Sequence, residues 1–303
     1  LLNLVMLISY SWALTGVYLD ESEISPQTCK LSFVEMKFHK IPVDEKGHPY
    51  DKDGKPYGEI EIIEGPKESF FCSSTLISPN MLASAAHCYE KQITFWDGKK
   101  VEYIKKQNCD EDGQNCVPIP ECEIDNWRES EKCAEKKFFR MRKVPKGVKA
   151  TCYNRGEVQE RFIPYQNAWP HPQYQKDDEK FAYQVYDAAF LRFDEPIKES
   201  FMKPLRPILD YFELNYIFNQ PEVIKTCKLQ GYGWNNDLGY GTLNAVRFYQ
   251  AQLKDNFIEF PSKFNSVAFG DSGGSLICTL PNGEDVFLGI ISVTDYADLE
   301  RAR

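Results

Sequence analysis

A serine surrounded by glycines is the first group in this sequence that could do chemistry. Ser272 lies in the stretch FGDSGGSL, with Gly270 two residues before it and two glycines directly after it. A fold keeps glycine where the backbone must approach another group closely or adopt a conformation that other residues avoid. A serine hydroxyl becomes a strong nucleophile when a neighbouring base removes its proton, and a third group usually orients that base. The stretch therefore predicts an activated serine.

Only four histidines could supply the base. His87 lies in LASAAHCYE, an apolar run of small residues that predicts burial on one side, whereas His39, His48 and His171 lie in polar or proline-flanked stretches typical of solvated or packing histidines. The best carboxylate is Asp187 in VYDAAFLRF, because strand-forming apolar residues on both sides predict an acid drawn into the interior. Such an acid needs a partner.

The order of these residues separates two kinds of serine hydrolase. GDSGG also fits the G-x-S-x-G turn of α/β-hydrolases, in which the serine precedes the acid and the histidine, but the 31 residues after Ser272 contain no histidine. The observed order is His87, Asp187, Ser272, within SAAHC, DAAFL and GDSGGSL. In this order and in these motifs the chain resembles the trypsin/chymotrypsin family of serine proteases.

Further landmarks carry the resemblance in patches from about residue 58 to 293. CSSTLIS, from Cys72, is similar to the strand before the family's histidine, HPQY, from His171, to the approach to its aspartate, and GYGW follows Cys227. The resemblance implies two disulfides, Cys72–Cys88 and Cys227–Cys278. It also implies two six-stranded antiparallel β-barrels with the triad between them, and short strand-like runs broken by turn residues independently favour an all-β fold.

The resemblance implies a secreted serine endopeptidase that acts on protein or peptide substrates through an acyl-enzyme intermediate, without a cofactor. Ser272 would attack the peptide carbonyl, His87 would carry the proton and Asp187 would orient the imidazole. The backbone N–H groups of Gly270 and Ser272 would bind the oxyanion. An activating protease and a protein inhibitor are the expected partners.

The resemblance also locates the residues that would set specificity and activation, by their distance in sequence from the same motifs. Ser266 stands where the family sets the base of its primary pocket, so an acid for binding Lys or Arg is absent, and Ser292 and Thr294 fall on the substrate-pairing strand. A branched residue at Thr294 would narrow the pocket, which predicts a preference for small or medium apolar side chains. The nearest match to an activation site is the bond between Lys40 and Ile41, which predicts a zymogen with a propeptide at residues 17–40.

The apolar start of the chain resembles a signal peptide over residues 1–16, truncated at its beginning and cut after Ala13. The protease domain is expected at residues 41–303, with its two barrels meeting near 196–226. The 100 residues from His87 to Asp187 exceed the family's usual spacing about twofold, which predicts a Cys-rich insertion at about 90–160. The second barrel looks unfinished, because the family continues beyond the end of this sequence.

Composition narrows the function further. A net charge of −9 and the lack of a basic cluster interleaved with aromatics argue against nucleic acid as a partner. No apolar segment after the expected signal peptide is long enough to span a membrane. Ten cysteines predict five disulfides, and the absence of C-x-x-C pairs or nearby histidines argues against a metal site. Six cysteines leave 15 pairings open: Cys29, Cys109, Cys116, Cys122, Cys133 and Cys152.

A second function remains open beside the enzyme. The unfinished pocket and the imperfect activation site are also what a secreted, catalytically inactive, protease-like binding protein would have. All three triad residues are present, which favours the enzyme.

Overall fold

The structure is a computed structural model of the 303-residue chain. It describes all residues except 1–4, 9–18, 90–94, 110–115, 124, 175–185, 235–240, 248–251, 255–256, 260–269 and 294–303. The chain divides into two compact units. Unit 1 comprises Leu1–Met36, Pro66–Lys91 and Pro145–Arg303, and unit 2 comprises Lys37–Gly65 and Gln92–Val144.

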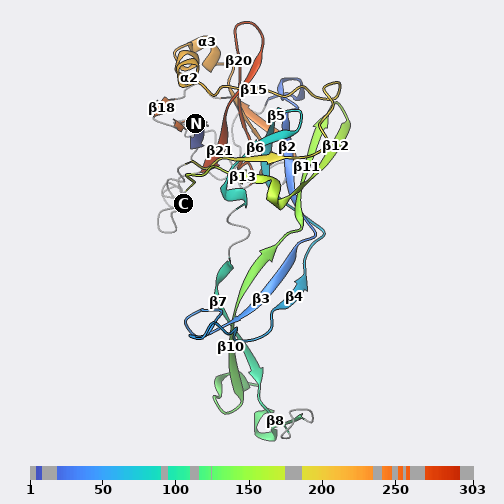
Figure 1. Cartoon of the computed structure of the whole chain (residues 1–303), viewed down its shortest axis with the longest axis vertical. Helices are drawn as coiled ribbons and strands as arrows, with labels where there is room; N and C mark the ends of the chain where they lie inside the picture. Colours follow the sequence, from blue (N-terminus) through green and yellow to red (C-terminus); the bar gives the residue numbers. More distant parts are fainter. Residues whose placement is uncertain are drawn as a thin grey trace. The chain divides into compact units, whose positions relative to one another are not determined.

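Unit 1 contains a seven-stranded sheet that is antiparallel throughout (Figure 1). At one end β11 and β12 form a hairpin whose turn, Arg155–Gly156, has positive φ at both residues, as a tight hairpin turn of this kind requires. The strands, in spatial order, are β12 (Glu157–Pro164), β11 (Gly147–Asn154), β2 (Thr28–Val34), β5 (Glu68–Ser78), β6 (Met81–Ser84), β14 (Ala189–Arg192) and β13 (Ala168–Pro170).

An eight-stranded sheet forms the other half of unit 1. The neighbouring strands β16 and β20 have described side chains that are buried at almost every position, although Lys228, Gln230 and Ser275 among them are polar. Strand β15 (Arg206–Pro207) pairs with β21 off the main path. That path runs through β17 (Asn244–Arg247), β16 (Lys228–Gly231), β20 (Ser275–Thr279), β21 (Asp285–Val293), β1 (Val5–Ile8), β19 (Phe257–Glu259) and β18 (Gln252–Lys254).

Two short helices close the core beside this sheet. Helix α2 (Tyr211–Phe218) begins after Asp210, whose carboxylate accepts a hydrogen bond from the backbone N–H of Glu213, and α3 (Pro221–Ile224) follows. Their buried residues pack into one apolar cluster with β16, β20 and β21. Single 3-10 turns lie at Glu21–Glu23, Pro120–Cys122, Trp127–Glu129 and Tyr165–Asn167.

A buried polar network joins the two sheets of unit 1. The hydroxyl of Ser275 on β20 lies 2.7 Å from that of Thr28 on β2 and 2.5 Å from that of Thr75 on β5. Gln230 on β16 donates to the Thr28 hydroxyl and exchanges two hydrogen bonds with the backbone of Ser25. Because buried polar groups are costly without partners, this network fixes how the sheets meet.

Unit 2 is built on a four-stranded sheet and a small hairpin. Few of its side chains are buried, and all of β4 is exposed. Lys40 of β3 bridges Glu61 on the neighbouring strand and Glu102 two strands away on the other side. The sheet order is β4 (Glu61–Glu64), β3 (Lys37–Val43), β10 (Ala134–Val144) and β7 (Phe95–Lys105), and the hairpin pairs β8 (Gln107–Cys109) with β9 (Cys116–Pro118).

The expected all-β class is confirmed, because strands dominate and the sheets curl as half-barrels. Two complete six-stranded barrels are not confirmed: among the described residues no pairing joins the end strands of either large sheet. The expected insertion at about 90–160 also divides differently. Unit 2 takes residues 92–144 together with the earlier segment 37–65, whereas the hairpin of β11 and β12 belongs to unit 1.

Two other expected segments lie in the sheets. Residues 28–34, within the expected propeptide, form β2 in the middle of the seven-stranded sheet. Val5–Ile8, within the expected signal peptide, form β1, which pairs in parallel with β19 and β21. No helix in the described part of the chain is long and apolar enough to cross a membrane.

All ten cysteines are paired, as their even number predicts. The bonds Cys72–Cys88 and Cys227–Cys278, implied by the family resemblance, are both present. The pairings that the sequence left open are Cys29–Cys152, Cys109–Cys116 and Cys122–Cys133.

Candidate active site

Strand pairing brings together two residues that are 100 positions apart. His87 follows β6 and starts a short helical turn at residues 87–89, and Asp187 lies two residues before β14. Because β6 and β14 pair antiparallel, with Ser84 opposite Ala189, the end of one strand lies beside the start of the other. The small residues around both positions allow this close approach.

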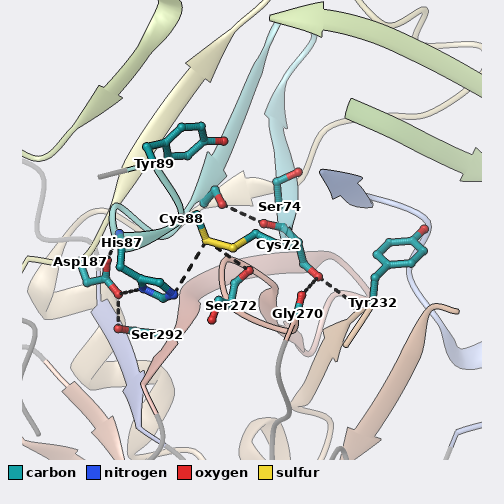
Figure 2. Close-up of a disulfide and its surroundings, with 12 residues drawn as sticks. Cys72, Ser74, His87, Cys88, Tyr89, Asp187, Tyr232, Gly270, Ser272 and Ser292 are labelled. Carbon is teal, nitrogen blue, oxygen red and sulfur yellow. Dashed lines mark hydrogen bonds and ion pairs between the residues drawn. A yellow bond between two sulfur atoms is a disulfide. The ribbon is translucent and has the colours of Figure 1, made fainter. Parts of the chain in front are cut away.

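The histidine and the aspartate form a bidentate contact. Nδ1 of His87 lies 2.6 Å from Oδ2 of Asp187, and the backbone N–H of His87 donates to Oδ1 at 2.7 Å. The hydroxyl of Ser292, on β21, donates to the same Oδ2 at 2.5 Å. The Asp187 side chain is fully buried, whereas that of His87 keeps 15% of its surface exposed. The acid is thus enclosed while part of the His87 side chain stays accessible; Figure 2 shows how the His87 ring, Asp187 and Ser292 lie together.

The surroundings keep Asp187 ionised. Burial alone would raise the pKa of this carboxyl, but the charge and the hydrogen bonds of His87, together with the Ser292 hydroxyl, outweigh burial and hold the pKa below its usual range. An ionised acid at this position stabilises a positive charge on the imidazole. It also fixes the ring with its hydrogen on Nδ1, which leaves Nε2 free to accept a proton.

The glycines around Ser272 are explained by the space around them. A Cβ on Gly273 would lie 2.2 Å from the backbone oxygen of Ser73, and one on Gly274 would lie 2.2 Å from that of Gln230. Gly270 has a φ of +97°, and a Cβ there would lie 2.8 Å from the ring of Phe70. The serine loop is therefore pressed against β5 and β16, where no side chain fits.

The loop is held by its own backbone and by a buried acid. The N–H of Gly274 donates to the carbonyl of Asp271 at 2.8 Å, and the N–H of Gly273 donates to the carbonyl of Ile291 at 2.7 Å. The Asp271 side chain is fully buried, and its Oδ1 accepts from the N–H of Gly233 at 2.7 Å. These contacts fix the backbone on both sides of Ser272.

The third contact of a complete triad is not formed. Figure 2 shows the Nε2 edge of His87 turned toward Ser272, but no hydrogen bond joins Nε2 to the hydroxyl of Ser272 among the described residues. The Cys72–Cys88 disulfide lies beside both groups, with Sγ of Cys88 4.0 Å from Nε2 and 3.9 Å from the carbonyl oxygen of Ser272. The structure therefore places the described side chains of His87 and Ser272 on either side of the same disulfide without a hydrogen bond between them.

Other expected site residues have mixed outcomes. Ser292, expected on the substrate-pairing strand, contacts Asp187 directly. Ser266 and Thr294, expected to shape the primary pocket, lie outside the described residues. Sulfur and nitrogen atoms of Cys72, His87 and Cys88 come within 4.8 Å of one another, but both sulfurs belong to one disulfide, and a metal would need thiolates.

A cavity of about 1310 Å³ lies elsewhere in unit 1, and none of the three triad positions lines it. Lys228 and Asp285 both border it, with Nζ of Lys228 donating to the backbone oxygen of Glu23 at 2.5 Å. Burial lowers the pKa of Lys228, although it stays close to Asp285. Lys228 pairs there with Asp285 and Arg247 with Glu23, and because no residue of the candidate site lines the cavity, it adds nothing to the chemistry of that site.

Sequence reasoning missed Ser73. It lies next to Cys72 in CSSTLIS and makes two hydrogen bonds to the loop that carries Ser272. The available signal was the run of hydroxyl residues Ser73, Ser74 and Thr75 on this strand, since a buried hydroxyl must find a partner.

Comparison with known proteins adds no identification: no protein-family model matches the chain, and no curated protein matches it.

Proposed function

We propose that this chain is a serine endopeptidase that cleaves peptide bonds through His87, Asp187 and Ser272. The observation that carries the proposal is the buried, ionised Asp187, which binds both the backbone and the ring of His87 beside a glycine-lined serine loop. A histidine that only filled space would not need a buried carboxylate oriented by two of its own N–H groups.

The proposed reaction follows the charges. Nε2 of His87 takes the proton of the Ser272 hydroxyl as the serine oxygen bonds to the carbonyl carbon of the substrate, and the negative charge passes to the carbonyl oxygen. The imidazolium is stabilised by Asp187 and then gives its proton to the leaving amine as the peptide bond breaks. Water repeats the sequence on the acyl-enzyme and releases the acid.

The missing contact between His87 and Ser272 is compatible with this proposal. Hydrogen bonds of catalytic groups are often long or poorly aligned before substrate binds, and they tighten in the complex. Ser272 is partly exposed, and we infer that its side chain turns toward Nε2 when substrate binds.

The oxyanion is assigned to the backbone N–H groups of Gly270 and Ser272. One such donor is typically worth about 3 to 4 kcal/mol of transition-state stabilisation. A glycine at position 270 suits this role, because the positive φ there directs the backbone in a way that other residues resist.

The finer assignments rest on the same resemblance. The two curled sheets of unit 1 correspond in this proposal to the two barrels of the chymotrypsin type. Five disulfides favour an oxidising compartment, which supports secretion. With Ser266 and Thr294 at the pocket, the expected substrates have small or medium apolar side chains before the cleaved bond.

Activation by cleavage between Lys40 and Ile41 remains a prediction, and it requires a local opening of the structure. This bond lies inside β3, which pairs on one side with β4 and on the other with β10. A protease could cut there only after the strand opened locally. The segment before the cut would stay attached, because Cys29 is bonded to Cys152. N-terminal sequencing of the secreted protein would give a chain beginning at Ile41 if this bond is used.

A fluorophosphonate probe tests the function directly. The serine of an active triad displaces fluoride from the probe and becomes covalently labelled, whereas an ordinary serine does not react. We expect the purified protein to be labelled and Ser272→Ala to remain unlabelled. Absence of labelling in a folded protein whose mature N-terminus is known would reject the enzyme and favour the inactive binding protein.

A further inference from the structure

We propose that Ser73 is a positioning residue for the oxyanion site, fixing the backbone on both sides of Asp271. The inference rests on the proposed function. It concerns a residue of β5 that touches neither the substrate nor the reacting atoms and acts through Gly270 and Ser272.

Ser73 bonds to the serine loop twice. Its backbone N–H donates to the carbonyl of Ser272 at 2.8 Å, and its hydroxyl donates to the carbonyl of Gly270 at 2.8 Å. The third carbonyl of this stretch, that of Asp271, is bound by the N–H of Gly274. One residue therefore holds two of three successive carbonyl groups.

The direction of the hydroxyl is set by another strand. The backbone N–H of Tyr232 donates to Oγ of Ser73 at 2.9 Å, so the hydroxyl accepts one bond and its own hydrogen points toward Gly270. The two partner residues, Gly270 and Tyr232, are drawn in Figure 2. Ser73 is fully buried, and without its hydroxyl the N–H of Tyr232 and the carbonyl of Gly270 would both lose this partner.

This arrangement matters because of where the two oxyanion donors lie. They are the N–H groups of Gly270 and Ser272, and the peptide group between Gly270 and Asp271 separates them. The hydrogen bond from Ser73 holds the carbonyl of this peptide group and so fixes the plane of the group. It therefore also fixes the relative direction of the two N–H donors. Gly270 gives little resistance to rotation by itself, since glycine populates positive and negative φ almost equally. The hydroxyl supplies the restraint.

The test compares Ser73→Ala with Ser74→Ala. Ser74 is the neighbouring residue on β5, is equally buried and donates to the backbone oxygen of Cys29 at 3.2 Å, away from the loop. Both variants lose one buried hydroxyl, so they match in chemistry and in volume. We measure the second-order rate of labelling by a fluorophosphonate across pH, together with thermal unfolding to confirm that each variant is folded.

We expect Ser73→Ala to be labelled about tenfold more slowly than the wild type, as loss of one positioning hydrogen bond implies, with Ser74→Ala within about twofold. The midpoint of the pH profile should stay unchanged in both, because the base His87 is untouched. Equal rates for the two alanine variants, or a shifted midpoint in Ser73→Ala, would overturn the inference. Lack of labelling in the wild type would instead reject the proposed function.

A second variant covers the case in which Ser73→Ala does not fold. Ser73→Cys keeps a weak donor on a longer bond, and we expect a rate between those of the wild type and the labelling background. A folded Ser73→Cys labelled at the full wild-type rate would show that the hydroxyl positions nothing.

Discussion

The two units of this chain use their polar residues in opposite ways. In unit 1, hydroxyl and amide groups are buried and bonded across the two sheets, as with Ser275 between Thr28 and Thr75. In unit 2, the polar contacts are mostly surface ion pairs such as those of Lys40, and isoleucines of β4 face solvent. A buried network restrains geometry, whereas exposed pairs are screened and easily exchanged. The buried hydrogen bonds of unit 1 therefore restrain the geometry of the candidate site, whereas unit 2 should tolerate substitutions in its surface ion pairs.

The largest effect is expected when the charge of the buried Asp187 in unit 1 is removed. We expect Asp187→Asn to lower the rate of fluorophosphonate labelling about 10⁴-fold, because the amide cannot stabilise the imidazolium and favours the wrong ring tautomer. Asp194→Asn, at an exposed position on the same segment, serves as the control and should leave the rate unchanged. A loss below tenfold in Asp187→Asn would mean that the acid is structural only.

Removing one disulfide from each unit compares their stability. The Cys29–Cys152 bond of unit 1 spans 123 residues, and Cys109–Cys116 of unit 2 spans 7. On the chain-entropy account, the double serine variants should lose about 5 and about 2 kcal/mol of the free energy of unfolding, respectively. Chemical denaturation measures both losses. Equal losses would contradict the idea that the long cross-link limits the unfolded chain more.

The buried network of unit 1 predicts a smaller effect. Ser275→Ala leaves the hydroxyls of Thr28 and Thr75 without their shared partner, and we expect it to cost about 1 to 3 kcal/mol of unfolding free energy. Ser78→Ala is a matched control, because that hydroxyl is only partly buried and bonds to its near neighbour Asn80. A cost below that of the control would show that the network does not stabilise the junction of the sheets.

The smallest effect is expected in unit 2. Glu102→Gln neutralises one acidic partner of Lys40 and leaves Lys40 itself, the residue before the predicted cleavage, in place over Phe139. Partly exposed ion pairs of this kind contribute less than about 1 kcal/mol, so stability should change little and the labelling rate not at all. A fall in labelling would instead link the sheet of unit 2 to the site.

Short sequence motifs predicted that His87 and Asp187 would pair. They did not predict the contacts that side chains make with backbone atoms. His87 and Asp187 were found because each lies in a short pattern of buried, small residues with one polar group that needs a partner. The hydroxyl of Ser73 escaped notice because its partners are carbonyl and N–H groups of Gly270 and Tyr232, and backbone atoms leave no trace in a sequence.

The division into units was harder to predict for the same reason. The run EIEIIEGPKESFFCSSTLIS predicts two strands around a Gly-Pro turn, and β4 and β5 lie on either side of that turn. The two strands nevertheless pair in different sheets, because β4 aligns with β3 and β5 aligns with β2 and β6. Strand partners depend on long-range complementarity, which the local alternation of side chains does not encode.

The position of β2 has a consequence for biosynthesis. Its neighbour β5 follows within the next part of the chain, but its other neighbour, β11, begins 113 residues after β2 ends, beyond both segments of unit 2. At a translation rate of roughly 5 to 20 residues per second, one edge of the nascent sheet stays open for about 6 to 23 s. During that interval the edge is a target for chaperones and for mispairing, and Cys29 has no correct partner until Cys152 has been made.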